Sequence, residues 1–225
     1  LSFSNDGKYS SFVEQNVPVN GSTAIVKATT DNWEKKFSNG TSCEIFADSR
    51  RYVVSIPDSI GIGVLGSDEI KYIPDVSNYT LLKKGATGNC LLYQSASHGT
   101  EIRLRDLQSQ KEKSFDSVIG FWFNDNSPLL ALETSISPQG KETIKLLIFD
   151  METGETKNIW AGVSMGRITF DETGTKLAFL GASSGNPIKN EAVWYFQSDD
   201  TSARKLLPDS TSVSYTHLTL PTILR

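Results

Sequence analysis

The chain has 225 residues, of which 38% are hydrophobic and 10% are aromatic, a composition typical of soluble globular proteins. Its net charge is −4 and its Lys and Arg residues are dispersed, so the sequence lacks the basic surface expected of a nucleic-acid-binding protein. No apolar run is long enough to cross a bilayer, and we expect no membrane span.

A hairpin pattern recurs along the chain, and residues 168–180 show it most clearly. The β-prone run Ile168–Phe170 leads into the turn residues Asp171–Gly174, and a second apolar run follows at Lys176–Leu180. In such a turn the carboxylates can accept hydrogen bonds from nearby amides, and the glycine can adopt a positive φ. This stretch therefore predicts a β-hairpin.

Similar hairpins begin at five anchor positions, and a second hairpin follows each of them. The anchors are Phe3, Phe46, Lys84, Phe123 and Phe170, of which the copy at Lys84 is the weakest. The second hairpins are Thr23–Phe37, Gly61–Ile73, Glu101–Phe115, Lys145–Trp160 and Ala192–Leu206. Two hairpins in roughly 40 residues are the spacing of four-stranded β-propeller blades.

The alternation of side chains within a strand supports the same fold. Leu146 and Ile148 share one face of their strand, while Leu147 and Phe149 share the other, as expected for a strand packed between two blades. Leucine-rich repeats would be shorter, and helical repeats would need a 3.6-residue period. We predict an all-β fold, a partial β-propeller of about five four-stranded antiparallel blades.

The C-terminal residues depart from the repeat pattern. Ser212–Arg225 reads SVSYTHLTLPTILR and resembles a read-through tail rather than a blade. We therefore assign residues 1–209 to the propeller and treat residues 210–225 as a tail of non-native appearance. On this interpretation the chain is a truncated fragment of a natural protein that continues beyond about Asp209.

One motif has the pattern of a catalytic site. Gly162–Gly166 reads GVSMG and matches G-x-S-x-G, in which the serine follows a strand and precedes a helix. Here a β-prone run follows instead, and the only later histidine, His217, lies in the tail. We interpret the motif as a connector between blades and predict no catalytic residue.

The other chemically reactive residues form no recognisable site. His98 lies in a turn rich in Ser and Gly and is expected to be exposed, while Cys43 and Cys90 are expected to be buried free thiols. Because no metal-ligand spacing and no phosphate-binding loop is present, we predict neither a metal nor a cofactor. The turns at 31–32, 124–126 and 199–200 lack a calcium-loop pattern, and local hydrogen bonding explains their Asp and Asn residues.

The four tryptophans are expected to pack between blades, and the alternative is that they belong to a binding face. They are Trp33, Trp122, Trp160 and Trp194.

With these repeats in view, the sequence resembles a known family. FSNDGKYSSF at Phe3 matches in full, and FADSRRYVVSI at Phe46 and FDETGTKLAFL at Phe170 match in part, the S-x-D-G-K-x-hydrophobic blades of the prolyl oligopeptidase family of serine peptidases. The partner hairpins LRDLQSQKEKSF and LLIFDMETGETKNIW also match. The overall sequence pattern is similar to that of large secreted or periplasmic members of this family from Bacteroidota. WD-repeat-like and TolB-like propellers share the pattern, so a binding propeller without enzymatic activity is the alternative.

The resemblance implies a role within a larger enzyme. In that family an N-terminal propeller caps a C-terminal α/β-hydrolase domain with a Ser–Asp–His triad and limits access to short peptides. This chain would then be the non-catalytic gating propeller of a periplasmic or secreted serine peptidase, with the hydrolase domain of the same parent chain and peptide substrates as partners. The hydrolase domain is absent from this sequence, so no triad residue can be assigned. The Glu pair with which dipeptidyl-peptidase relatives hold a peptide N-terminus is also missing, and five blades are fewer than the usual seven or eight.

Overall fold

We describe residues 1–82, 90–137, 142–185 and 191–206 of a computed structural model of the chain. Within these ranges the chain forms twenty β-strands and no helix. The strands are β1 (Ser2–Phe3), β2 (Tyr9–Gln15), β3 (Ser22–Ala28), β4 (Glu34–Ser38), β5 (Ser42–Ile45), β6 (Arg51–Ile56), β7 (Ser59–Val64), β8 (Ile70–Pro74), β9 (Val76–Leu82), β10 (Cys90–Ser95), β11 (Ile102–Asp106), β12 (Glu112–Phe115), β13 (Val118–Phe123), β14 (Leu129–Ile136), β15 (Thr143–Asp150), β16 (Thr156–Gly162), β17 (Ser164–Phe170), β18 (Lys176–Ala182), β19 (Ala192–Gln197) and β20 (Arg204–Lys205).

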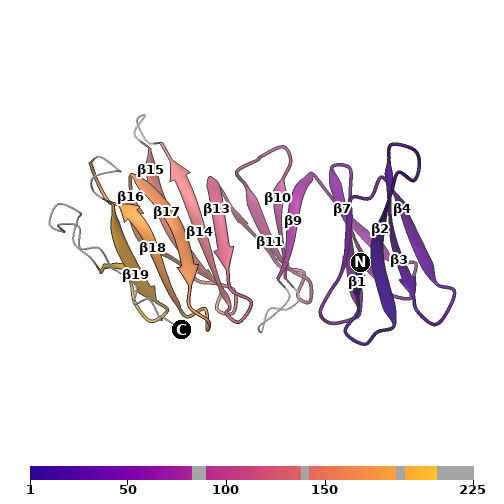
Figure 1. Cartoon of the computed structure of the whole chain (residues 1–225). Helices are drawn as coiled ribbons and strands as arrows, with labels where there is room; N and C mark the ends of the chain where they lie inside the picture. The colour runs from indigo at the N-terminus through magenta and orange to yellow at the C-terminus, as the bar shows by residue number, and fades with distance from the viewer. Residues whose placement is uncertain (83–89, 138–141, 186–190, 207–225) are drawn as a thin grey trace, which may run out of the picture.

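The strands form five antiparallel sheets, each built from four consecutive strands in sequence order. In Figure 1 the sheets follow one another in chain order, from the indigo first sheet on the right to the yellow last sheet on the left. Four-stranded sheets repeated in this way are the blades of a β-propeller. The predicted all-β fold of about five blades is therefore confirmed, and we number the blades one to five from the N-terminus.

The predicted hairpins correspond to pairs of strands. The anchors Phe3, Phe46, Phe123 and Phe170 each lie at or next to the end of the first strand of a blade, and the second hairpin of every repeat forms the third and fourth strands. The anchor at Lys84 lies outside the described residues, between β9 and β10. The tail from 210 to 225 is likewise outside them.

The turn chemistry expected in the anchor hairpins is present. In blade five Asp171 accepts a hydrogen bond from the amide of Lys176 (3.0 Å) and another from the hydroxyl of Thr173 (2.7 Å), and Gly174 has a φ of 68°. These bonds satisfy the polar groups of the turn locally.

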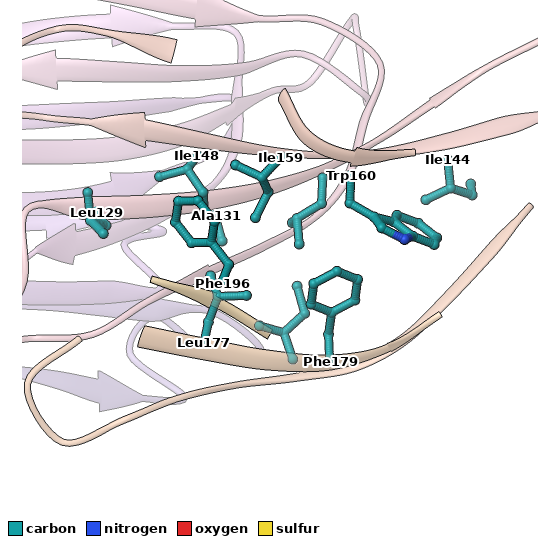
Figure 2. Close-up of a cluster of buried hydrophobic side chains, with 11 residues drawn as sticks. Leu129, Ala131, Ile144, Ile148, Ile159, Trp160, Leu177, Phe179 and Phe196 are labelled. Atoms are coloured by element: carbon teal, nitrogen blue, oxygen red, sulfur yellow. The ribbon is translucent and has the colours of Figure 1, made fainter. Parts of the chain in front are cut away.

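Hydrophobic clusters join each blade to the next. Blades one and two share Ala24, Val26, Cys43, Ile45, Tyr52, Val54 and Leu65. Blades two and three share Phe46, Val53, Ile60, Ile73, Val76, Leu81, Leu91, Tyr93 and Leu107. Blades three and four share Leu82, Cys90, Leu92, Ile102, Leu104, Phe115, Val118, Leu130, Leu132 and Phe149. Blades four and five share Leu129, Ala131, Ile144, Leu146, Ile148, Ile159, Trp160, Ile168, Leu177, Phe179 and Phe196, most of which are labelled in Figure 2.

Strand β15 contributes to two of these clusters, as its alternation predicts. Leu146 and Ile148 pack toward blade five, while Phe149 and the partly buried Leu147 pack toward blade three. Apolar side chains thus cover both faces of the strand, which confirms that it lies between two neighbouring blades.

Hydrogen bonds between turns also join the blades. The amide nitrogen of the Asn5 side chain donates to Ala47 O (2.9 Å), and that of Asn124 donates to Asp171 O (2.9 Å). The buried hydroxyl of Ser127 donates to Gly174 O (2.8 Å). The expectation that local bonding accounts for the turn at 124–126 is therefore incomplete, because its side chains also bind the corresponding turn of the next blade.

We expect Gly63→Ala to lower the free energy of unfolding by about 1–3 kcal/mol, the usual cost of overpacking a core. Gly63 lies opposite Tyr52 in the β6–β7 pair, and a Cβ there would stand 2.2 Å from the buried Tyr52 ring. Urea denaturation would measure the change. Gly99→Ala is the matched control, because a Cβ at Gly99 meets nothing within 4 Å. Equal effects of the two substitutions would contradict this account.

Candidate functional site

In a propeller the four strands of each blade follow one another outward from a central channel, so the first strand lies nearest to the channel. The first strands of the blades are therefore the candidate binding wall. Between blades three and four, the first strand β13 leaves a cleft of about 260 Å³ against β10 and β11. Its lining comprises Gln94, Ile102 and the stretch Val118–Trp122 of β13. This volume is below the range of about 300–1,000 Å³ typical of small-molecule pockets, so the cleft suits a single side chain.

A β-bulge shapes this cleft. In the β13–β14 pair, Val118 lies opposite Thr134 and Gly120 opposite Glu133, so Ile119 is an extra residue without a partner. Bulges commonly redirect a side chain next to a functional site. The side chain of Ile119 is 52% exposed, which is unusual for an aliphatic residue beside a hydrophobic cluster.

An acidic group lies against the same strand. A Cβ on Gly120 would stand 2.7 Å from the Trp122 ring and 3.1 Å from Glu133 Oε2, so ring and carboxylate meet over the open face of this glycine. Burial raises the pKa of Glu133 above its ordinary value. Among the described residues, no cation or hydrogen-bond donor pairs with this carboxylate.

The G-x-S-x-G motif does not form a nucleophile elbow. Gly162 ends β16, Val163 connects the two blades, and Ser164 already belongs to β17, so no helix follows the serine. The motif does include the connection between the two blades, as predicted, but only Val163 lies between the strands. Its last three residues belong to β17. Gly162 has a packing role, since a Cβ there would lie 2.4 Å from Ala182 O and 2.4 Å from the Trp160 ring.

His98 is exposed, as predicted, and it ends a short chain of hydrogen bonds. Asp75 Oδ2 accepts bonds from the hydroxyls of Ser95 (2.6 Å) and Ser97 (2.7 Å), and Ser97 Oγ lies 2.9 Å from His98 Nδ1. In a catalytic triad the histidine lies between the acid and the hydroxyl. Here the hydroxyl lies between them, so the arrangement fixes the β10–β11 loop rather than activating a nucleophile.

Both cysteines are free and buried, as predicted. Burial raises the pKa of Cys43 to about 12 and that of Cys90 to about 11. Because the thiolate is the reactive form, these thiols are unsuited to nucleophilic chemistry at neutral pH.

All four tryptophans pack against clusters between blades, as predicted. Trp33 packs against the cluster between blades one and two, and Trp160 and Trp194 pack between blades four and five, with ring centroids 5.9 Å apart. Trp122 also packs against that cluster, but it lines the cleft at β13 as well. The sequence alone could not single out Trp122, because the bulge that opens the cleft leaves no signal in the residue pattern.

The described parts of the chain contain no group of three His, Cys, Asp or Glu side chains that could hold a metal ion. In the same ranges, no helix has the length and hydropathy required to cross a membrane.

Comparison with solved structures supports the fold assignment. The β-propeller domain of the Trilobed protease from Pyrococcus furiosus, described as having an open velcro topology, aligns with a TM-score of 0.52 and 15% identity over 89% of this chain and 69% of that chain. An acylaminoacyl peptidase from Pyrococcus horikoshii aligns with a TM-score of 0.43 and 14% identity over 83% of this chain and 31% of that chain. A functionally unknown protein from Desulfotomaculum acetoxidans aligns with a TM-score of 0.47 and 14% identity over 91% of this chain and 67% of that chain.

The first of these likenesses shows that the chain has the fold of a β-propeller domain. No protein-family model and no curated protein sequence matches the chain.

We expect Gly162→Ala to destabilise the chain by about 1–3 kcal/mol, because its methyl group would clash with a backbone carbonyl and with Trp160. Gly166→Ala is the matched control, since its nearest contact would be the Leu180 side chain at 3.3 Å. Thermal unfolding of both variants would measure the difference. Covalent labelling of Ser164 by a fluorophosphonate would show that the motif is catalytic and would contradict the packing account.

We expect acid to loosen the β10–β11 loop through Asp75. Hydrogen bonds from Ser95 and Ser97 hold the pKa of Asp75 below its usual value. A carboxylate with a lowered folded-state pKa contributes stability above its unfolded pKa, and this contribution is lost as the pH falls through the folded value. The protection of the amides in residues 96–101 against exchange, relative to their intrinsic exchange rate at the same pH, should therefore fall in acid. Asp75→Asn should show fast exchange already at neutral pH, and an unchanged loop in that variant would refute this role.

Proposed function

We propose that this chain is a non-catalytic part of the propeller of a prolyl-oligopeptidase-like serine peptidase that acts on peptides. The observation that carries the proposal is the combination of the S-x-D-G-K-type blade repeat, complete at Phe3, with the fold of a protease's β-propeller domain. The absence of a triad from the described residues is compatible with this role, because the hydrolase domain of the parent chain would supply catalysis.

The outer face of blade five supports a larger propeller. Leu177 and Phe179 of β18 pack against blade four, so the alternating residues Ala178 and Leu180 project from the opposite face. Val193 and Tyr195 of β19 lie opposite Leu180 and Ala178, respectively, and extend this apolar surface. Leu180 is 38% exposed, whereas each interface between described blades buries its apolar residues.

Blade one also has apolar residues on its outer side, since the 57% exposed Phe3 shares that face with the Phe12–Ile25 pair. Its outward residues include Lys27 and Lys36 around the Phe12–Ile25 pair, and Lys27 lies over the Phe12 ring at 5.4 Å. Long basic side chains can cover apolar surface with their stems. We therefore include in the proposal that a further blade of the parent protein packs against blade five. The proposal also gives the parent protein a periplasmic or secreted location.

The proposed role of the propeller is to control which molecules reach the hydrolase site. A propeller placed over a hydrolase site would let short peptides pass and keep folded proteins out, because its central channel is narrow compared with a globular domain. The parent enzyme would cleave peptides by acyl transfer at the serine of its own triad. This chain would contribute the wall of the channel.

The decisive test is to recover the coding sequence on both sides of this chain and to produce the intact protein. We expect an α/β-hydrolase domain, cleavage of short peptides, and no cleavage by the 225-residue chain alone. Replacing the elbow serine of the hydrolase domain by alanine should abolish activity while leaving thermal unfolding of the propeller unchanged. An intact gene that encodes only further blades would refute the proposal and favour a WD-repeat-like or TolB-like binding propeller.

A further inference from the structure

The cleft between blades three and four continues an interface that is already apolar. Ile102 and Val118 line the cleft and also belong to the buried cluster between these blades, and the partly buried Phe121 packs against that cluster. An apolar side chain entering the cleft would therefore extend an existing hydrophobic contact. Its burial would be favourable for the same reason as that of the cluster itself.

Strand β13 can also offer main-chain hydrogen bonds to a ligand. It is the first strand of its sheet. Its Val118 amide donates to Thr100 O (2.8 Å), and beyond that bond the edge away from β14 has no strand partner among the described residues. A free strand edge carries backbone N–H and C=O groups that can pair with an added extended segment. The exposed Ile119 projects from this strand at its bulge.

The charge on the opposite face of β13, toward blade five, favours a cation. Glu133 Oε2 and the Trp122 ring both lie against Gly120, and no described residue neutralises the carboxylate. A carboxylate attracts a positive charge, and an aromatic ring contributes a cation–π interaction. The net charge of −4 favours the approach of the same kind of partner.

We propose that this cleft binds an extended peptide in which a large apolar residue is followed by a lysine or arginine. The apolar side chain would lie between Ile102 and Ile119, and the peptide backbone would pair with the free edge of β13. The next residue of an extended segment points to the opposite face, where its basic side chain would reach Glu133 and Trp122. The proposal rests on the proposed function, since it names the class of peptide that the channel wall selects.

The test uses the whole 225-residue chain and four acetylated, amidated hexapeptides that differ only at their two central residues. These residues are Phe-Arg, Ala-Arg, Phe-Gln and Ala-Gln, and calorimetric titration would measure binding. We expect the Phe-Arg peptide to bind about tenfold more tightly than the Ala-Arg peptide, because burying a large apolar side chain is worth about one factor of ten or more. Replacing Arg by Gln should weaken binding severalfold.

Two substitutions locate the binding site on the chain. Ile119→Asp should weaken binding of both Phe peptides about tenfold or more, while Glu133→Gln should remove the preference for Arg over Gln and leave the preference for Phe. The matched controls are Val64→Asp, at a half-exposed valine on β7, and Glu14→Gln, at an exposed glutamate on β2. Both control variants should bind as the unmodified chain does, and circular dichroism would check that all four variants fold.

The outcomes separate this inference from the proposed function. Equal affinity for all four peptides, or equal effects of Ile119→Asp and Val64→Asp, would overturn the inference even if the intact protein proves to be a peptidase. Association of the chain with itself that Ile119→Asp abolishes, without peptide binding, would also overturn it in favour of a second copy at the same strand edge. The predicted peptide selectivity together with a parent gene that lacks a hydrolase domain would sustain the inference and refute only the peptidase proposal.

Discussion

The burial of apolar faces between consecutive sheets is the interaction on which the rest of this structure depends. A four-stranded sheet such as β13–β16 is apolar on both faces, so in isolation it would expose Leu130 and Leu132 on one side and Leu146 and Ile148 on the other. Each blade is therefore stabilised by its neighbours, and stability accumulates along the chain from interface to interface. The candidate cleft exists because one of these interfaces remains open where β13 faces β10 and β11.

Polar groups complement this packing at the turns. The asparagine and serine side chains of one turn donate to backbone carbonyls of the corresponding turn in the next blade, as Asn5 does to Ala47 and Asn124 does to Asp171. Such bonds are directional, whereas hydrophobic contact is not. They can therefore set the angle between blades that already adhere through their apolar faces.

The residue pattern was sufficient to predict the hairpins, because the alternation in Leu146–Phe149 and the turn chemistry of Asp171–Gly174 are local properties. It could not predict the features that depend on a neighbouring strand or blade. The early start of β17 at Ser164 requires pairing with β18 beyond a bulge, and the exposure of Ile119 requires the bulge in β13. The positions of Glu133 and Trp122 beside Gly120 likewise arise only when β13 and β14 lie side by side.

The packing of Trp160 bears on how this part of the chain can change during evolution. Its ring fills the space left by two missing side chains, those of Gly162 and Gly181, which come from different blades. The three positions therefore share one fixed volume, and a side chain can be gained at either glycine only if the tryptophan becomes smaller. Related sequences should therefore vary together at positions 160 and 181, whereas Gly162 is also constrained by the backbone carbonyl of Ala182 and should vary less.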